Sequence, residues 1–204
     1  MGIIVRLPRT AALAAVFLGF AAVTLRAEPL PLPSADYATT AKMAGGMTMM
    51  SRHSKGKIRV EMQVPGMPSP MTAYIDLRAK KAVTVMAAPG MGNMAIEADL
   101  GDGDEFGVAV GRGNRVGNAT VAGETCDLWE IESDQKDIKK SKAVACLTSD
   151  SIPLRMEATI DGKRQVVFEV TELSRAPQDP KLFSPSANLK PMRLPKGMMP
   201  PTGK

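Results

Sequence analysis

Residues 57–64 read KIRVEMQV, and this stretch decides the class of fold. Charged or polar side chains alternate strictly with apolar ones, which are Ile58, Val60, Met62 and Val64. Because successive side chains of a β-strand point to opposite faces, the pattern predicts a strand with one buried face and one solvated face. Such strands are typical of antiparallel sheets, in which one face packs on a core and the other meets water.

The same alternation recurs along much of the chain. It continues into Val83 and Val85 after a turn at residues 78–81, and the pair Asp161-Gly162 predicts a tight hairpin further on. The other alternating apolar positions are Met71, Ala73, Ile75 and Leu77, then Leu154, Met156, Ala158 and Ile160, then Val166, Phe168 and Val170. The sequence therefore predicts a mainly antiparallel β-domain with one apolar face that must be covered.

Less regular segments complete the expected sheet. We expect strands at residues 37–43, 47–54, 106–110, 116–122, 125–132 and 142–148, and either a short helix or a strand at 91–100. The β-domain spans residues 36–185, between a proline-rich segment at 28–35 and a tail at 186–204. Because Pro, Lys and Met dominate the tail without any pattern, we expect it to be disordered.

Residues 1–27 have the features of an export signal. Arg6 and Arg9 precede an uncharged apolar run at 11–23, and residues 25–27 offer a small-residue cleavage site. The run is shorter than the ~20 residues needed to span a bilayer, and no later segment is a transmembrane candidate. We therefore expect a mature chain in the periplasm or secreted, without a transmembrane segment.

Removal of this signal would change the charge balance. The signal contains three of the 26 basic side chains and none of the 21 acidic ones, which leaves 23 basic against 21 acidic side chains. Nucleic-acid binding needs a clustered basic surface, and base stacking needs aromatic side chains, which are scarce here. We therefore expect no nucleic-acid partner.

Two cysteines, Cys126 and Cys146, lie outside the signal. An even number in an exported chain favours a structural disulfide, here across a hairpin formed by the strands expected at 125–132 and 142–148. Such a bond would remove about 3 kcal/mol of unfolded-chain entropy. The alternative is two free buried thiols, whereas a redox enzyme is disfavoured because the spacing is not Cys-x-x-Cys.

Three motifs resemble those of an uncharacterised family of exported bacterial domains. They are Val121-Ala122-Gly123-Glu124-Thr125-Cys126, Cys146-Leu147-Thr148-Ser149-Asp150-Ser151-Ile152-Pro153-Leu154-Arg155 and Leu182-Phe183-Ser184-Pro185. That family is similar to the outer-membrane lipoprotein carrier (LolA-like) superfamily. The resemblance implies an incomplete antiparallel barrel or strongly curved sheet, with a concave apolar face and few short helices. Ser151 departs from the pattern, since the family usually has Gly there.

The family has no known common ligand, so the functional hypothesis rests on the inner face: a concave apolar sheet can hold a hydrophobic small molecule, a lipid or the acyl chain of a lipoprotein. Methionine suits such a lining, since its unbranched side chain adapts to guests of varying shape. The alternative is that the inward residues form an ordinary filled core. The side chains expected on the concave face are Ile58, Val60, Met62, Ile75, Val83, Val85, Leu154, Met156 and Phe168.

A methionine-rich stretch supports a second hypothesis, a Cu(I)-binding module. Thioether sulfurs and one imidazole are a soft ligand set that selects Cu(I), and the candidates are Met43, Met47, Met49, Met50 and His53. Strand periodicity places Met50 on the face opposite Met47 and Met49, so all five could reach one ion only across a bend. The alternative is simply a methionine-rich apolar face.

Catalysis has little support in the sequence. His53 is the only histidine and no nucleophile motif flanks it, which excludes a multi-histidine zinc site and disfavours a catalytic triad. We therefore expect a non-enzymatic protein without a cofactor. A third hypothesis is an adaptor whose sheet edge or Pro/Met tail docks another envelope protein.

Overall fold

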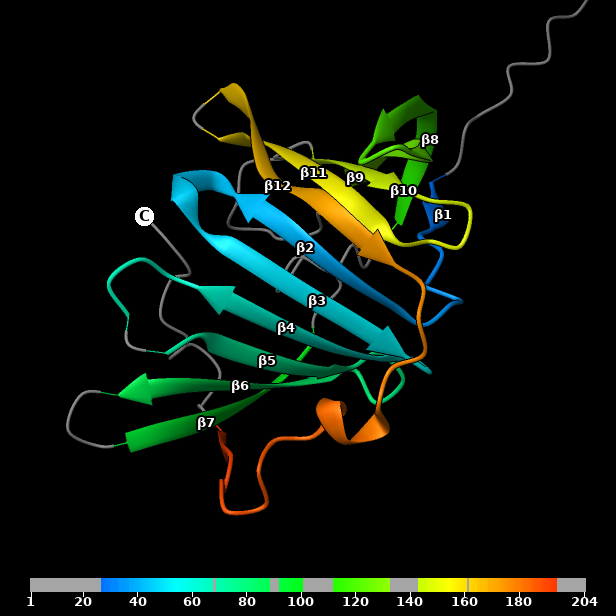
Figure 1. The fold of residues 1–204 in the computed structure, drawn as a ribbon. Helices are drawn as coiled ribbons and strands as arrows, with labels where there is room; N and C mark the ends of the chain where they lie inside the picture. Colours follow the sequence, from blue (N-terminus) through cyan, green and yellow to red (C-terminus); the bar gives the residue numbers. More distant parts are fainter. Residues whose placement is uncertain are drawn as a thin grey trace, which may run out of the picture.

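The computed structural model describes residues 27–67, 69–88, 92–100, 112–132, 143–160 and 162–193. These residues form one open, strongly curved sheet that does not close into a barrel (Figure 1). This part of the chain contains no α-helix, only two short 3-10 turns, η1 (Ala44–Gly46) and η2 (Pro180–Phe183). The expected fold class, mainly β with a curved and almost entirely antiparallel sheet, is confirmed.

The described residues contribute thirteen strands to the sheet, and two runs of consecutive strands make up most of it. In chain order the strands are β1 (Glu28–Pro29), β2 (Tyr37–Met43), β3 (Thr48–Ser54), β4 (Lys57–Gln63), β5 (Met71–Asp76), β6 (Lys81–Ala88), β7 (Gly92–Asp99), β8 (Arg112–Val121), β9 (Glu124–Glu132), β10 (Ala143–Leu147), β11 (Pro153–Ile160), β12 (Lys163–Ser174) and β13 (Met192–Arg193). Strands β2 to β7 form one run and β8 to β12 the other, and β12 pairs with β2 to join them. The two-residue strands β1 and β13 pair with the outer strands β8 and β7.

The described strands follow most of the sequence expectations. Of residues 91–100, the described ones, 92–100, contain strand β7 and no helix, which favours the strand alternative. The strand expected at 106–110 lies outside the described residues. In the tail, Met192–Arg193 pair with β7, so the expected disorder is corrected for this part of residues 186–204. No helix among the described residues is long and apolar enough to cross a bilayer.

In two hairpins, both residues of the turn have a left-handed backbone conformation. Lys55 and Gly56, between β3 and β4, have φ of 52° and 81°, and Ala122 and Gly123, between β8 and β9, have φ of 50° and 79°. Positive φ at both central residues is the type I′ geometry, whose twist matches that of the flanking strands, and glycine adopts it without steric cost. The first of these turns fixes the register of β3 against β4.

The longer turn between β5 and β6 changes which positions face inward. Four residues separate the two strands, so Ile75 lies opposite Ala82, and Tyr74 lies opposite Val83. Inward positions therefore carry odd numbers in β5 and even numbers in β6, because paired residues share a face. The expected inward orientation of Val83 and Val85 is wrong, since both lie on the outer face.

A disulfide joins the neighbouring strands β9 and β10. Cys146 lies opposite Leu128 and bonds diagonally to Cys126, and the Cα atoms of the two cysteines are 5.4 Å apart. Both cysteines are buried in the main apolar cluster. The expected disulfide is confirmed, and it belongs to the core of the domain.

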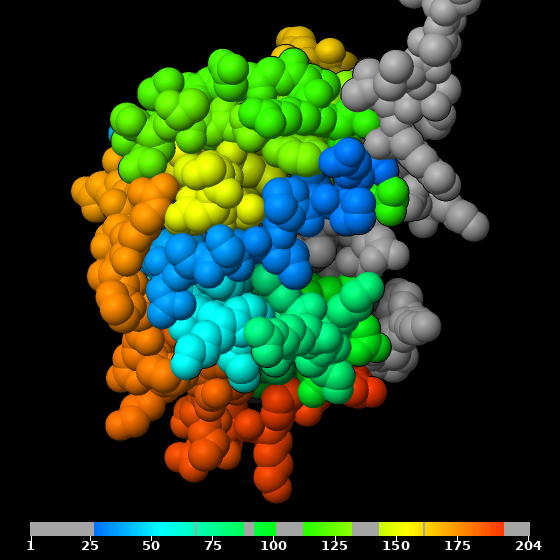
Figure 2. Space-filling model, turned by 90° about the vertical axis from the view of Figure 1, so that its right-hand side faces the viewer, coloured from blue at the N-terminus to red at the C-terminus, as the bar shows by residue number. Residues whose placement is uncertain are grey.

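A single apolar cluster unites the two runs of strands. It contains Leu30 from the N-terminal segment, Val60 from the first run and Leu154 from the second. Figure 2 shows the N-terminal residues and β2, in blue, packed between the β8 to β10 region, in green and yellow, and β3 to β5, in cyan to teal. The N-terminal segment therefore holds the two runs together.

Candidate functional site

Cross-strand register divides the inner face of β2 to β7 into three rows that run across the strands. Directly opposite residues on one face have Cβ atoms about 4.5–5.5 Å apart, so the members of a row are neighbours. The histidine row is Tyr37, His53, Ile58, Ile75 and Ala82. The middle row is Thr39, Ser51, Val60, Ala73 and Thr84, and the methionine row is Met49, Met62, Met71, Met86 and Met94.

The histidine row is a closed, fully packed end of the inner face. His53 is 2% exposed and stacks on Tyr37, with the ring centroids 5.4 Å apart and the planes 19° from parallel. Its Nε2 accepts a hydrogen bond from the backbone N–H of Gly56 at 3.1 Å, so the proton lies on Nδ1. Nδ1 donates that proton to the carbonyl oxygen of Ala35 at 2.7 Å. Both ring nitrogens therefore have structural partners.

Burial at this end also affects Tyr37. Removal of its hydroxyl from water raises the pKa of Tyr37 to about 12, although a hydrogen bond with Ser51 opposes the rise. Ser51 belongs to the middle row, in which Thr39 and Thr84 are also buried. Tyr37 and Ser51 thus link the histidine row to the middle row through a neutral hydrogen bond.

The segment that leads into β2 closes the histidine end. The backbone N–H of Ser34 donates to the carbonyl oxygen of Asp150 at 3.1 Å. The carboxylate of Asp36 accepts hydrogen bonds from the hydroxyl of Ser54 at 3.0 Å and from the backbone N–H of Gln178 at 3.3 Å. This segment therefore ties β3 to the β10–β11 turn and to the chain that leaves β12.

The methionine row lies at the other end of the same strands and is more exposed. Met49 is 4% exposed, whereas Met62, Met71, Met86 and Met94 are only half-buried. Met49 lies directly opposite Met62, which lies directly opposite Met71. Met71 and Met86 each lie one position beyond the pair Thr72–Val85 that ends the ladder between β5 and β6, and Met86 pairs with Met94. The paired strands therefore gather five methionines at this end of the inner face.

The structure separates the nine expected guest-binding residues into three groups. Met62 belongs to the methionine row and is partly buried against the apolar cluster, and Val83 and Val85 lie on the outer face. The remaining six form the packed interior at 2% exposure or less, and they are Ile58, Val60, Ile75, Leu154, Met156 and Phe168. Of the nine, only Met62 is thus both inward-facing and partly accessible.

Two of the five residues expected to bind Cu(I), His53 and Met50, are directed away from such a site. His53 has no free nitrogen, because Ala35 and Gly56 engage both. Met50 is 37% exposed and lies next to Met49 in β3, so its side chain points to the outer face. Among the described residues, no group of three His, Cys, Asp or Glu side chains could hold a metal ion. His53 and Met50 therefore do not fit the expected ligand set, and Cu(I) binding by Met43, Met47 and Met49 stays a prediction.

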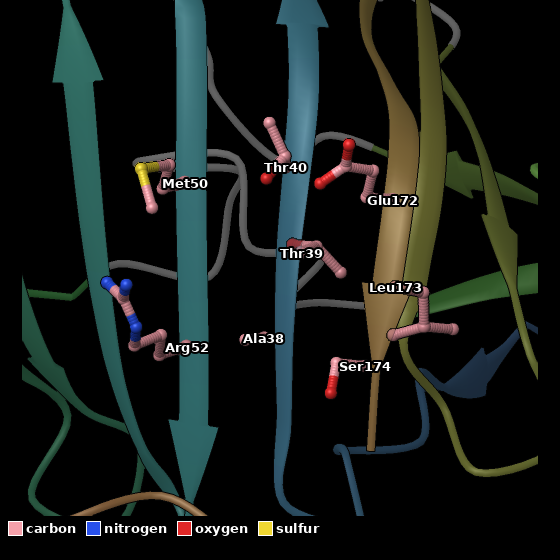
Figure 3. A pocket seen from close by; sticks show the side chains of 8 residues that line it. All are labelled: Ala38, Thr39, Thr40, Met50, Arg52, Glu172, Leu173 and Ser174. Carbon is pink, nitrogen blue, oxygen red and sulfur yellow. The ribbon is translucent and has the colours of Figure 1, made fainter. Parts of the chain in front are cut away.

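Sequence reasoning missed a shallow groove of about 240 Å³ on the outer face, across β12, β2 and β3 (Figure 3). Ala38 of β2 lies between its cross-strand partners Arg52 of β3 and Ser174 of β12, and its short side chain leaves the floor of the groove open. The lining combines apolar, hydroxyl and charged groups, from Ala38, Thr39, Thr40, Met50, Arg52, Glu172, Leu173 and Ser174. No sequence motif marks this groove, since it depends on which strands become neighbours.

An ion cluster ties together three strand ends near the closed end of the sheet. Arg175 donates to both carboxylate oxygens of Glu124 at 3.0 Å and to Asp150 at 2.8 Å. Hydrogen bonds from Arg175 hold the pKa values of both carboxyl groups below their usual range. Reciprocally, the two carboxylates raise the pKa of Arg175.

No protein-family model matches this chain, and no curated protein matches it. Solved structures of similar fold include PNGF-II, at 10% identity and a TM-score of 0.50 over 79% of this chain and 31% of that one. The Pseudomonas aeruginosa MucA/MucB complex matches at 15% identity and a TM-score of 0.46, over 83% of this chain and 62% of that one. A LolA superfamily protein from Nitrosomonas europaea matches at 9% identity and a TM-score of 0.37, over 76% of this chain and 93% of that one.

These similarities concern the fold alone. The chain spans about a third of the matched PNGF-II chain and about three fifths of the matched MucA/MucB chain. The similarity to the LolA superfamily protein, at a TM-score of 0.37, does not place this chain in a superfamily, and no family is shown. Because unrelated functions share folds, function must be argued from the residues of this chain.

Proposed function

We propose that the protein is a non-enzymatic binding protein of the cell envelope that holds a hydrophobic guest, a lipid or an acyl chain, on the inner face of its curved sheet. The supporting observation is the gradient of exposure between the buried histidine row and the half-buried methionine row. A guest that covers the methionine row would gain about 25 cal/mol for each Å² of apolar surface it removes from water.

The guest contacts in this proposal differ from those expected from the sequence. Met62 and Met71 would contact the guest, because the six buried residues already pack on one another. Flexible thioether side chains can adapt to an acyl chain, which has no fixed shape. The two structural hydrogen bonds of His53 support the absence of catalysis, since they leave that ring no nitrogen to act as a base.

Titration of the delipidated protein with a fluorescent long-chain fatty acid tests the proposal. We expect Met62→Gln and Met71→Gln each to cost about 1 kcal/mol of binding free energy, roughly fivefold in affinity. Met50→Gln is the matched control, because this methionine lies on the outer face, and it should leave the affinity unchanged. The proposal would be contradicted if the unmodified protein and the three variants bound the fatty acid with equal affinity and native mass spectrometry found no lipid on the purified protein.

Export belongs to the proposal and has its own test. N-terminal sequencing of the protein recovered from the envelope fraction should begin at Glu28, after removal of residues 1–27. Recovery of the protein with an intact N-terminus in the cytoplasmic fraction would contradict the proposed location in the cell envelope. Docking of another envelope protein stays a prediction, and deletion of residues 190–204 would test the contribution of the tail.

A further inference from the structure

Three methionines from adjacent strands lie in direct register on one face of the sheet. Met49 of β3 lies opposite Met62 of β4, and Met62 lies opposite Met71 of β5. The three positions are far apart in the sequence, and only the pairing of the strands brings them into one line. Met62 occupies the centre of this line, with one thioether on each side.

The geometry allows the three sulfur atoms to converge. Opposite residues have Cβ atoms about 4.5–5.5 Å apart, and each sulfur lies two bonds beyond its Cβ. The methionine side chain has three rotatable bonds and no branch, so Met49 and Met71 can both turn their sulfurs toward that of Met62. A single ion above Met62 is therefore within reach of three thioethers.

The ligand chemistry selects the ion. Thioether sulfur is a soft, uncharged ligand that suits monovalent soft cations and not Mg²⁺ or Ca²⁺, which prefer oxygen. The two cysteines compete poorly for such an ion, because they are joined in a buried disulfide. We propose that Met49, Met62 and Met71 form a three-thioether binding site for Cu(I) or Ag(I).

Partial exposure makes this site feasible for a charged ion. A bound monovalent cation would face no neutralising ligand here, and full burial of an uncompensated charge would be costly. Met62 and Met71 are only half-buried, so the ion stays partly hydrated on its open side. The site differs from the sequence-based set because it excludes His53 and Met50 and includes two residues from β4 and β5.

Competition between the delipidated protein and a chromophoric Cu(I) chelator tests the site. Ascorbate, which is not a thiol, would keep copper reduced and leave the disulfide intact. We expect one Cu(I) per chain, with affinity lowered at least about tenfold by Met62→Leu and by Met71→Leu, since even loss of an outer-shell partner costs that much. Met50→Leu is the matched control and should bind as the unmodified protein does. Equal affinity in Met62→Leu, Met71→Leu and the unmodified protein would overturn the proposal.

A second measurement needs no variant and so does not depend on variant folding. Addition of Ag(I) to protein labelled at the methionine ε-methyl groups, in chloride-free buffer, should shift the resonances of Met49, Met62 and Met71 together at one equivalent. The resonance of Met50 should stay in place. Unmoved resonances for the three, or a shift confined to other methionines, would overturn the site even if the protein binds the metal elsewhere.

Discussion

The two ends of the inner face are built from the same strands yet differ in chemistry. At one end, Tyr37, His53 and Ile58 are stiff aromatic, imidazole and β-branched groups, and the segment that leads into β2 covers them. At the other end, Met62 and Met71 are flexible and half-buried. The comparison shows that core and accessible surface need not be alternatives, because one apolar face can be filled at one end and partly open at the other.

The strongest test of this difference compares two residues of β4. Ile58→Ala should lower the free energy of unfolding by about 3–4 kcal/mol, because it leaves a cavity among fully buried neighbours. Met62→Ala should cost only about 1–2 kcal/mol, because its surroundings are half-open and can relax or admit water. Urea unfolding of both variants measures the difference, and equal losses would contradict the distinction between the ends.

His53→Leu should have the next largest effect. It leaves the carbonyl oxygen of Ala35 and the N–H of Gly56 without their side-chain partner and removes the stacking on Tyr37, at a cost of about 2–3 kcal/mol. Urea unfolding again provides the measurement. Tyr37→Phe is the control, since it keeps the stacked ring, and it should cost less. If His53→Leu were neutral, the hydrogen bonds would not be what closes this end.

The sequence predicted strands well because alternation is local, but it could not predict all the faces. Val83 and Val85 were assigned to the wrong face. The four-residue turn between β5 and β6 shifts the inward positions from odd residue numbers in β5 to even ones in β6. Phe168 was assigned correctly, although the two-residue hairpin turn alone would have turned it outward. A bulge between the pairs Met156–Phe168 and Glu157–Val166 adds a residue to β12 and restores its inward orientation.

The methionine row could not have been derived from the sequence for a similar reason. Met49, Met62 and Met71 show no common spacing, and their alignment appears only once the register of three strands is known. The sequence instead drew attention to Met50 and His53, which are close to Met49 in the chain. In the structure, Met50 points to the outer face, and both ring nitrogens of His53 are hydrogen-bonded. Cross-strand register, rather than composition, decides which thioethers become neighbours.

Ser151→Gly should stabilise the closed end of the inner face. Ser151 has φ of 66°, a left-handed conformation that is costly for a residue with a Cβ, and it lies beside the hydrogen-bonded Asp150 turn. Glycine removes this strain but adds unfolded-chain entropy, so we expect a gain of about 0.5–1 kcal/mol. Thermal unfolding measures it. Ser149→Gly, at a residue without positive φ in the same turn, should instead destabilise the protein slightly.

The smallest expected effect concerns Arg175 and depends on pH. Because Arg175 lowers the pKa values of Glu124 and Asp150 in the folded state, their contribution is present above the ordinary carboxyl pKa of about 4 and is lost as pH falls through the lowered values. Arg175→Gln should therefore lower the melting temperature by a few degrees at neutral pH and hardly at all in strong acid.

Melting curves over a range of pH measure this effect. The difference in melting temperature between Arg175→Gln and the unmodified protein should shrink as the pH falls. Arg164→Gln serves as the control, because Arg164 pairs with Glu157 at the opposite end of β12. A constant difference between Arg175→Gln and the unmodified protein at every pH would mean that Arg175 acts through packing and not through its charge.

The pairing of β12 with β2 has a consequence for how the chain matures. Each run of strands can form by local hairpins, but β2 must wait for a strand that follows it by more than a hundred residues, as the contact between Thr40 and Thr171 illustrates. Until β12 has been synthesised, β2 has one unpaired edge on which another chain could add. We therefore expect that the β2 edge of the incomplete chain must be shielded from other chains during biosynthesis, and that this need ends once β12 has paired with it.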